Sequence, residues 1–418
     1  MSHPGLPHHG PDERKGGAPG SRPSPEGWDP VTASRPAGLA PVVRYFLYLG
    51  ALGFGGPVAL VGYMQRDLVE RRGWFTKDEY LKGLALSQLA PGPLAAQLAI
   101  CLGYVQARVW GATVVGLAFI LPSFLMTVAI GWIYVRYGGL PGMQAAFYGV
   151  GAAVIGIIVR SAYKLGRITL GPDPLLWGVF AVMAIVTAWT ESEIATLFIL
   201  CGLVVLLVQA PPRRVRAWLA PHRLLAAIPW PTLLQGLGQP AGGGTLAQIL
   251  WFFAKAGAFV FGSGLAIVPF LYGGVVQEYR WLDDRQFLDA VAVAMLTPGP
   301  VVITVAFIGY LVAGFGGAVA AAVGVFLPVY LFVVVPYPWF DRWSANPQVQ
   351  AFVRGVTAAA AGAIAGACYV LGKRAIFDVP TLVVALVALA VTSRFRIPEP
   401  LLIGAAAAAG LLIFSTPR

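Results

Sequence analysis

Pro91-Gly92-Pro93 interrupts one apolar stretch of this chain, and Pro298-Gly299-Pro300 interrupts another. A proline inside a helix removes a hydrogen bond, clashes with the preceding turn and costs about 3 kcal/mol. The residue before a proline is also pushed out of the helical region of backbone conformation. Each Pro-Gly-Pro motif therefore predicts that an apolar helix is broken at that point.

The two motifs belong to a repeat that extends over most of the sequence. They lie 207 positions apart (298 − 91), and the same offset joins Trp74 to Trp281. After one deleted residue the offset becomes 206 and aligns Gly103 with Gly309, Pro122 with Pro328, Gly149 with Gly355, and Glu193 with Glu399. One register kept over two halves indicates an ancient tandem duplication.

The composition is typical of a membrane protein. Hydrophobic residues make up 58% of the chain, charged residues make up 11%, and the mean hydropathy is +0.74. Apolar runs near the roughly 20 residues needed to cross a bilayer recur from Val42 onward, in about a dozen hydrophobic segments. The alternation typical of a membrane barrel is absent, so the segments are helical. The predicted fold class is an all-α polytopic membrane protein with two homologous repeats of about five to six hydrophobic segments each and Pro-interrupted helices.

The chain is expected to divide into four regions. Residues 1–38 are rich in Pro, Gly and charge, which predicts a disordered cytoplasmic tail. This stretch lacks the apolar core of a signal peptide, so we expect the first hydrophobic segment to direct insertion. The first repeat is expected over 39–210, a linker over 211–244 and the second repeat over 245–418.

Histidine and cysteine usage argues against metal and cofactor chemistry. Of four histidines, three lie in the tail and His222 lies in the linker. Cys101, Cys201 and Cys368 have no CxxC spacing. The usual ligands of haem, copper or zinc are therefore missing from the apolar segments, and we expect no metal site and no cofactor. These segments also carry no nucleophile motif or carboxylate pair, so we expect no catalytic residues.

Membrane orientation explains the net charge of +11 better than a nucleic-acid partner does, because the basic residues are spread over short loops. Five basic residues lie from Arg66 to Lys82, whereas the matching loop has Arg280 and Arg285 beside three acidic residues. The positive-inside rule places the first loop in the cytoplasm and not necessarily the second. This asymmetry predicts inverted repeats, although the arginines of the linker also favour the cytoplasm.

A helix broken at Pro-Gly-Pro predicts an anion site made of backbone. Proline suits the first position of a new helix, so we expect half-helices to begin at Pro93 and Pro300. The N–H groups of residues 94–96 and 301–303 then have no partner within the helix and lie at the positive end of its dipole. We predict substrate-binding or translocation residues at both motifs, with a nearby amide or hydroxyl: Pro91, Gly92, Pro93, Gln97, Pro298, Gly299, Pro300 and Thr304.

Glycine-rich turns form a second matched pair, since Gly53-Phe54-Gly55-Gly56-Pro57 aligns with Val260-Phe261-Gly262-Ser263-Gly264. Glycines in a membrane either permit close helix packing or let backbone N–H groups approach a ligand. Packing is an equal alternative for any single glycine. Because each copy accompanies a broken helix, we assign to the site Gly55, Gly56, Pro57, Gly262, Ser263 and Gly264.

Few charged side chains lie in apolar sequence. Lys255 precedes the second glycine turn, and its counterpart is Tyr48. A charge at that depth costs at least ~3 kcal/mol, so we assign Lys255 to the site, with a snorkelling lysine as the alternative. Weaker candidates for attracting an anion, for which a loop or interfacial position is the alternative, are Arg66, Arg72, Arg160 and Arg354. The matched Glu193 and Glu399 are either proton-linked carboxylates or helix caps.

These motifs resemble the signature of the chromate ion transporter family. The first half resembles it in Phe54-Gly55-Gly56-Pro57, Trp74, Leu89-Ala90-Pro91-Gly92-Pro93 and Gly103-Tyr104. The second half resembles it in Phe261-Gly262-Ser263-Gly264, Trp281, Thr297-Pro298-Gly299-Pro300 and Gly309-Tyr310. Together they cover nearly the whole chain beyond the tail and match the family's long, two-domain type. The chain departs from the pattern at Leu94 and Ala96, where some members carry an acidic residue and a further glutamine.

The resemblance implies a secondary transporter that exports chromate from the bacterial cytoplasm across the plasma (inner) membrane, energised by the proton motive force, and confers chromate resistance. Its implied partners are a small inorganic oxyanion, protons and the lipid bilayer that this multi-pass protein spans. A carrier of sulfate or another oxyanion is the alternative within transport. A membrane-embedded enzyme or a structural scaffold is the alternative of another class. Both a monomer and a homodimer are compatible with the sequence.

Overall fold

The computed structural model describes residues 38–54, 56–137, 141–190, 195–211, 244–259, 267–395 and 397–415, and within these ranges the chain is helical and has no strand. The first half forms α1 (Ala40–Leu52), α2 (Gly56–Met64), α3 (Lys77–Leu89), α4 (Leu94–Tyr137), α5 (Pro141–Leu170), α6 (Pro174–Thr190) and α7 (Ala195–Gln209). The second half forms α10 (Thr245–Phe259), α11 (Ile267–Tyr272), α12 (Asp284–Leu296), α13 (Thr304–Val334), α14 (Phe340–Ser344), α15 (Pro347–Ala375), α16 (Val379–Arg394) and α17 (Glu399–Ser415). Nearly all of the predicted tail and linker lies outside the described residues.

Several helices have the length and composition of membrane spans. Four that are long and apolar enough lie within the described ranges: Leu94–Tyr137, Gly142–Arg167, Val301–Arg342 and Pro347–Ala375. Shorter apolar helices of 10–17 residues accompany them. Helices satisfy their own backbone polar groups, which is what the hydrocarbon core of a bilayer requires. The prediction of an all-α polytopic membrane protein is confirmed.

α3 and the start of α4 form a helical hairpin with Pro91-Gly92-Pro93 at its tip. α3 has 13 residues, or about 20 Å at the helical rise per residue, which is too short for a hydrocarbon core of ~30 Å. The two helices lie side by side, because a carbon added at Gly83 would come within 3.2 Å of Leu98 and Cys101. In the second half α12 packs on α13, with Pro298-Gly299-Pro300 between them. Both motifs interrupt a helix, as predicted.

α4 and α13 each reverse direction at matched positions. The non-helical residues are Ala107 (φ −150°, ψ 39°) with Arg108 (φ 52°, ψ −141°), and Ala313 (φ −144°, ψ 30°) with Gly314 (φ 60°, ψ −150°). Gly103 and Gly111 consequently pack together, since a carbon added at Gly111 would overlap the Gly103 carbonyl oxygen. The 44 residues of α4 therefore form two antiparallel segments rather than one span.

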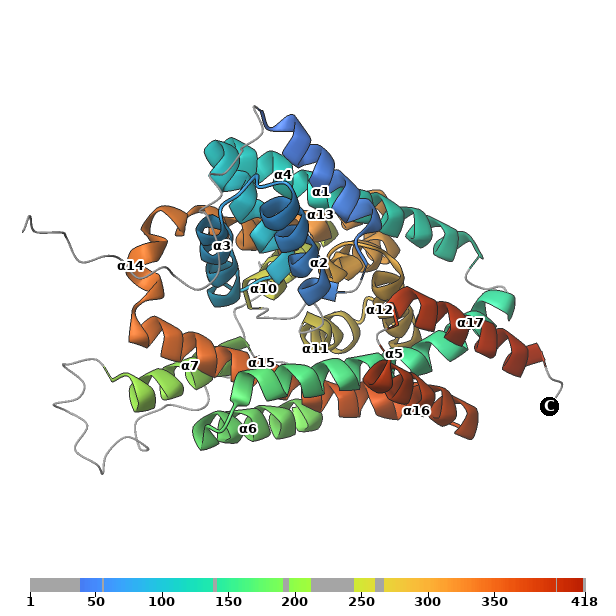
Figure 1. Ribbon diagram of the computed structural model, residues 1–418. Coiled ribbons are helices and arrows are strands. Elements are labelled where there is room, and N and C mark those ends of the chain that lie inside the picture. Colours follow the sequence, from blue (N-terminus) through green and yellow to red (C-terminus); the bar gives the residue numbers. More distant parts are fainter. Residues whose placement is uncertain are drawn as a thin grey trace, which may run out of the picture.

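The helices form two groups that lie against each other (Figure 1). One, named here the hairpin group, contains α1–α4 and α10–α13 and includes both Pro-Gly-Pro tips. The other, named the helical layer, contains α5–α7 and α15–α17; within it α15 packs on α5, α6 and α7, and α5 packs on α16 and α17. α12 belongs to the hairpin group but also contacts α5, α15 and α17. It therefore connects the two groups.

The two halves share local geometry at matched positions. In each, the backbone N–H of a tryptophan donates over 2.8 Å to the carbonyl oxygen six positions earlier, from Trp74 to Leu68 and from Trp281 to Val275. Each half then begins a hairpin helix with a capping box, on Thr76 in α3 and on Asp283 in α12. This agreement supports the inferred duplication. The domain boundaries and the inverted orientation of the repeats stay predictions.

Valine at Gly362 is expected to destabilise the helical layer. Gly362 in α15 faces α6, and a carbon added there would overlap the Phe180 carbonyl oxygen. Overpacking of this kind typically costs about 1–3 kcal/mol, so Gly362→Val should lower the apparent melting temperature of the protein purified in detergent. Gly178→Val in α6 is the matched control, because nothing lies within 4 Å of its added carbon. Equal melting temperatures for the two variants would contradict this packing.

Candidate functional site

The first Pro-Gly-Pro tip is a tight, buried turn between α3 and α4. Gly92 has φ +138°, and a carbon added there would lie 2.7 Å from Gln97 Nε2 and 3.0 Å from Val329. Only glycine adopts this backbone conformation without strain and leaves that space free. Gln97 is fully buried, and its Nε2 donates to the Pro91 carbonyl oxygen over 2.6 Å. The turn is therefore closed by the side chain of the helix that follows it.

The second tip bridges the two halves of the chain. Gly299 has φ +93°, and its N–H donates over 3.0 Å to the carbonyl oxygen of Gly53, where α1 has just ended. Ser123 in α4 donates to the Gly50 carbonyl oxygen over 3.1 Å. It also lies so close to Gly299 that an added carbon would overlap its Oγ. The second Pro-Gly-Pro motif thus packs on the end of α1 and on α4, both in the first half.

The free backbone donors differ between the tips. The N–H groups of Leu94, Ala95 and Ala96 have no hydrogen-bond partner among the described residues, as predicted. In the second half the prediction is wrong for Ile303, whose N–H donates to the Pro300 carbonyl oxygen over 2.9 Å. The reason is that residues Val301–Ile303 form a 3-10 turn, and in this geometry the Ile303 N–H bonds three residues back. The second tip therefore offers fewer donors than the first.

Gln97 and Thr304 support the turns. The Thr304 Oγ1 donates over 2.7 Å to the carbonyl oxygen of Val301, within the 3-10 turn, as Gln97 donates to Pro91. Thr304 is fully buried like Gln97. The Gln97 Oε1 atom is buried and has no hydrogen-bond partner in the described part of the chain. A role for either side chain in direct contact with an anion stays a prediction.

The structure describes only part of the predicted glycine turns. Gly53 follows α1 and donates its N–H to the Leu49 carbonyl oxygen over 2.7 Å, and Gly56 and Pro57 begin α2. Helical structure is therefore interrupted between α1 and α2, beside the second tip. The other predicted residues lie outside the described ranges: Gly55, Gly262, Ser263 and Gly264.

Lys255 lies in α10 of the hairpin group. Its side chain is partly buried and makes no ion pair within the described residues. Two residues further, Gly257 packs on the backbone of α13 at Val325, and the matched Gly50 packs on α4 at Phe119. The counterpart Tyr48 is exposed. Residues two apart in a helix face different sides, so this packing does not place the Lys255 side chain against α13, and its role in binding an anion stays a prediction.

The predicted arginines have different surroundings. Arg72 lies over the Trp74 ring, 4.6 Å from its centroid, and lines an open pocket of about 290 Å³. Arg44 in α1 lines the same pocket, together with Pro41, Tyr45 and Tyr48. Arg66 instead pairs with Asp67 over 3.1 Å. Arg44 was not among the residues predicted from the sequence; its spacing of four from Tyr48, on one helical face, was an available signal.

Arg160 and Arg354 lie in the helical layer and not at the tips. Arg160 in α5 is partly buried and, with Lys164, acts on Glu399 at the start of α17. Arg354 is exposed on α15. Glu193 lies outside the described residues. The structure therefore does not bring these charges to the Pro-Gly-Pro tips.

One buried carboxyl group was missed by the sequence analysis. Asp289 in α12 is only 4% exposed, and the Tyr134 hydroxyl of α4 donates to its Oδ2 over 2.7 Å. Its position in the apolar stretch before Pro298 was the available signal, because ionisable residues in such segments are costly and functional by default. Asp289 is therefore a further candidate for the functional site.

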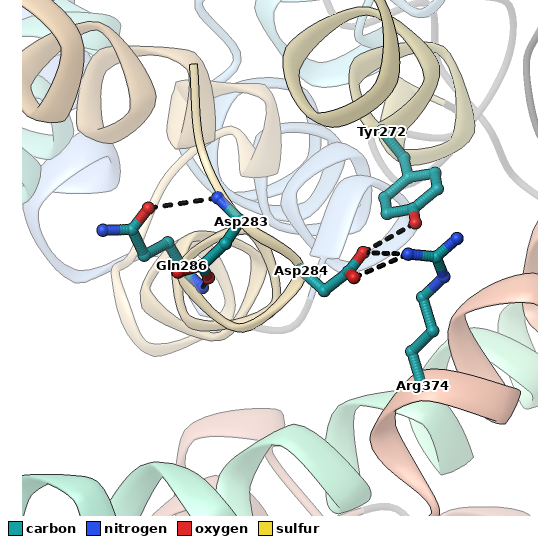
Figure 2. Close-up of polar contacts among 5 residues, drawn as sticks. All are labelled: Tyr272, Asp283, Asp284, Gln286 and Arg374. Atoms are coloured by element: carbon teal, nitrogen blue, oxygen red, sulfur yellow. Dashed lines mark hydrogen bonds and ion pairs between the residues drawn. The ribbon is translucent and has the colours of Figure 1, made fainter. Parts of the chain in front are cut away.

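A surface ion pair ties α12 to the helical layer. Arg374 of α15 contacts both carboxylate oxygens of Asp284 at 2.6 Å, and the Tyr272 hydroxyl of α11 donates to the same group over 2.7 Å (Figure 2). Asp283 and Gln286 form the capping box of α12 on the other side of its first turn (Figure 2). The start of the helix that leads to the second tip is thus fixed at two places.

A bundle of membrane helices with two Pro-interrupted hairpins, whose tips leave backbone donors unpaired inside the protein, is the architecture of a secondary membrane transporter. A family model described as a chromate transporter matches residues 40–207 and again residues 247–411. The chain therefore belongs to the chromate transporter family. It is a transporter and not an enzyme, and it is a multi-pass protein of the bacterial plasma membrane.

Three curated relatives illustrate the similarity. A chromate transport protein of Cupriavidus metallidurans is 59% identical over 379 residues, covering 90% of this chain and 93% of the relative. A probable chromate transport protein of Synechococcus elongatus is 56% identical, covering 90% and 96%. A chromate transport protein of Pseudomonas aeruginosa is 33% identical, covering 88% and 91%. No solved structure matches the chain at a significant level.

Alanine at Gly299 is expected to distort the second tip. The added carbon would overlap Ser123 Oγ, and the positive φ adds a cost of about 1–2 kcal/mol for a residue with a side chain. Gly299→Ala should therefore lower the apparent melting temperature in detergent. Adding Ser123→Ala removes the overlapping oxygen and leaves 3.1 Å to the Ser123 Cβ, so the double variant should recover part of the loss. A double variant no more stable than Gly299→Ala would show that this contact does not limit the turn.

Proposed function

We propose that the protein exports chromate from the cytoplasm by alternating access and thereby confers chromate resistance. The family and the relatives named as chromate transport proteins support this substrate. The observation that carries the proposed site is the set of unpaired N–H groups at residues 94–96, directly after the buried Pro93. They lie at a helix N-terminus, where backbone donors and the helix dipole both favour an anion.

The hydrogen-bond donors of the proposed oxyanion site are backbone groups, which do not titrate. Backbone N–H donors replace part of the hydration shell of a tetrahedral dianion and keep the same charge distribution at every pH. Lys255 of α10, a helix that packs on α13, supplies the fixed positive charge of the second half. Gln97 and Thr304 hold the turns and so hold the donors in place. The sequence also assigns to the proposed site Gly55, Gly56, Pro57, Gly262, Ser263 and Gly264.

The pocket between Arg44 and Arg72 is the proposed entrance. Two guanidinium groups beside one open cavity raise the local concentration of an anion and speed its arrival. Arg72 belongs to the loop that the positive-inside rule places in the cytoplasm. A cytoplasmic entrance agrees with export.

The membrane potential also favours export. Moving one charge through 100 mV is worth about 2.3 kcal/mol, so a dianion leaving an inside-negative cell gains roughly 4.6 kcal/mol per 100 mV. At about 1.4 kcal/mol per factor of ten, this supports a concentration ratio near 10³ without a second ion. Uptake has to overcome the same term. The proposed export therefore proceeds without obligatory coupling to protons.

A second oxyanion such as sulfate is the alternative substrate. The tip offers backbone donors, which respond to the shape and charge of a tetrahedral dianion and not to its central atom. The assay below therefore includes competing oxyanions.

Everted membrane vesicles from cells that make the protein are expected to take up chromate, because export from a cell corresponds to uptake by an everted vesicle. Dissipating the membrane potential should slow this uptake, since the lumen of such vesicles is positive. Excess sulfate or molybdate should compete only if the site accepts it. Equal chromate uptake by vesicles with and without the protein would refute the proposed function.

Removing the charge of Lys255 is expected to weaken substrate binding. Lys255→Gln should raise the KM for chromate by about tenfold, equivalent to ~1.4 kcal/mol, whereas Lys255→Arg should keep most of the affinity because it keeps the charge. Lys373→Gln is the matched control, because Lys373 is exposed on α15 of the helical layer. An unchanged KM in Lys255→Gln would remove this residue from the proposed site.

A further inference from the structure

Asp289 is a buried carboxyl group without a cationic partner in the part of the chain that the structure describes. Its residue is 4% exposed, and the Tyr134 hydroxyl donates to Oδ2 over 2.7 Å. No ion pair involves Asp289 in the described ranges. The Tyr134 ring is itself packed between Phe147 of α5 and Phe307 of α13, with centroids 5.6 Å and 5.3 Å away. A charge in such a place is costly unless it is paired or neutralised by a proton.

Three cations of the helices packed on α12 act on other carboxylates. Arg374 of α15 bonds to Asp284 at the first turn of α12 (Figure 2). Arg160 and Lys164 of α5 act on Glu399, which is the acidic residue of α17.

The remaining neighbours of Asp289 supply little charge. α13 contains no Asp, Glu, Lys or Arg, and α4 presents the Tyr134 hydroxyl while its Arg108 and Arg136 are exposed. On α12 itself Asp283 and Arg285, of opposite charge, act from the exposed first turn. A proton is therefore the neutralising partner that these surroundings allow.

At the matched position in the first half, the charged side chain is neutralised by an ion pair. The offset of 207 pairs Asp289 with Lys82, whose Nζ lies 2.6 Å from Asp341 Oδ2. Asp341 follows Phe340, the counterpart of Tyr134 under the offset of 206. Each hairpin helix is thus joined to the other half of the chain at this point, α3 to Asp341 just beyond α13 and α12 to Tyr134 near the end of α4. The first half uses a complete ion pair at the surface, and the second uses a buried carboxyl group with a hydroxyl donor.

We propose that Asp289 is a proton-binding site whose occupancy favours binding of the anion at the proposed site, of which the second tip is a part; this inference rests on the proposed function. The proton adds to Oδ1, the oxygen that does not accept from Tyr134, so the group changes from charge −1 to neutral and no other bond changes. α12 leads directly into the tip, with Asp289 eight positions before Thr297, or about 12 Å along the helix.

The coupling is electrostatic. A carboxylate about 12 Å along α12 from the second tip repels a dianion bound beside that tip, and the protonated carboxyl group does not. Even in a medium as polar as water, Coulomb's law gives about a threefold difference in affinity at this distance. By linkage, a bound anion equally favours the proton on Asp289. This site supplies the proton dependence that the backbone donors of the tips cannot supply.

The test compares chromate uptake by everted vesicles for wild type and Asp289→Asn between about pH 6.5 and pH 8.5. Asparagine mimics the neutral carboxyl group at every pH. The ratio of the wild-type KM to the Asp289→Asn KM should be near one at low pH and rise to about threefold or more at high pH. The protonation of chromate itself cancels in this ratio. A ratio that does not change with pH would overturn the inference.

Two further variants keep the test decisive. Tyr134→Phe removes the hydroxyl that stabilises the carboxylate, so the pH at which KM changes should move upward; an unmoved midpoint would overturn the inference even if Asp289→Asn failed to fold. Asp78→Asn, the same chemical change at an exposed position in the first turn of α3, should follow the wild-type profile. Absence of chromate uptake by the wild type would refute the proposed function instead.

Discussion

The rest of the structure depends on one constraint, namely that backbone polar groups inside a membrane need partners. Proline removes donors and breaks helices, so each Pro-Gly-Pro tip creates unpaired groups in a place without water. Short local bonds satisfy some of them, as Gln97 does for Pro91 and Thr304 does for Val301. Another is satisfied across the repeat, from Gly299 to Gly53. The donors left after this pairing are the ones available to an anion, and they are concentrated after Pro93.

The same constraint explains where the hairpins lie. α3 and α12 are too short to cross a bilayer, so their tips end inside the protein and have to be covered by other helices. Side chains of the other half provide part of that cover, with Val329 against Gly92 and Ser123 against Gly299. The helical layer lies on one side of this assembly, and α12 contacts it. In the proposed transport cycle, α12 transmits movement of the hairpin group to the helical layer.

Duplication produced two similar frameworks that no longer carry the same chemistry. The first tip is followed by an α-helix with free donors, whereas the second is followed by a 3-10 turn that consumes one. Tyr48 corresponds to Lys255, and Lys82 corresponds to Asp289. Lys255 and the buried carboxyl group of Asp289 thus both belong to the second half. Such a division suits a site in which one repeat supplies backbone donors and the other supplies charge.

The sequence by itself determined the features that follow from local chemistry and composition. Apolar segments gave the membrane helices, one register gave the duplication, and the sterics of Pro91, Pro93, Pro298 and Pro300 gave the broken helices. The tertiary structure alone decided which groups remain unpaired, because that depends on segments far apart in the chain. It showed that Gly299 bonds to Gly53, that Arg44 joins Arg72, and that Asp289 is buried against Tyr134. Pairing and burial are properties of packing between helices, and no local pattern specifies them.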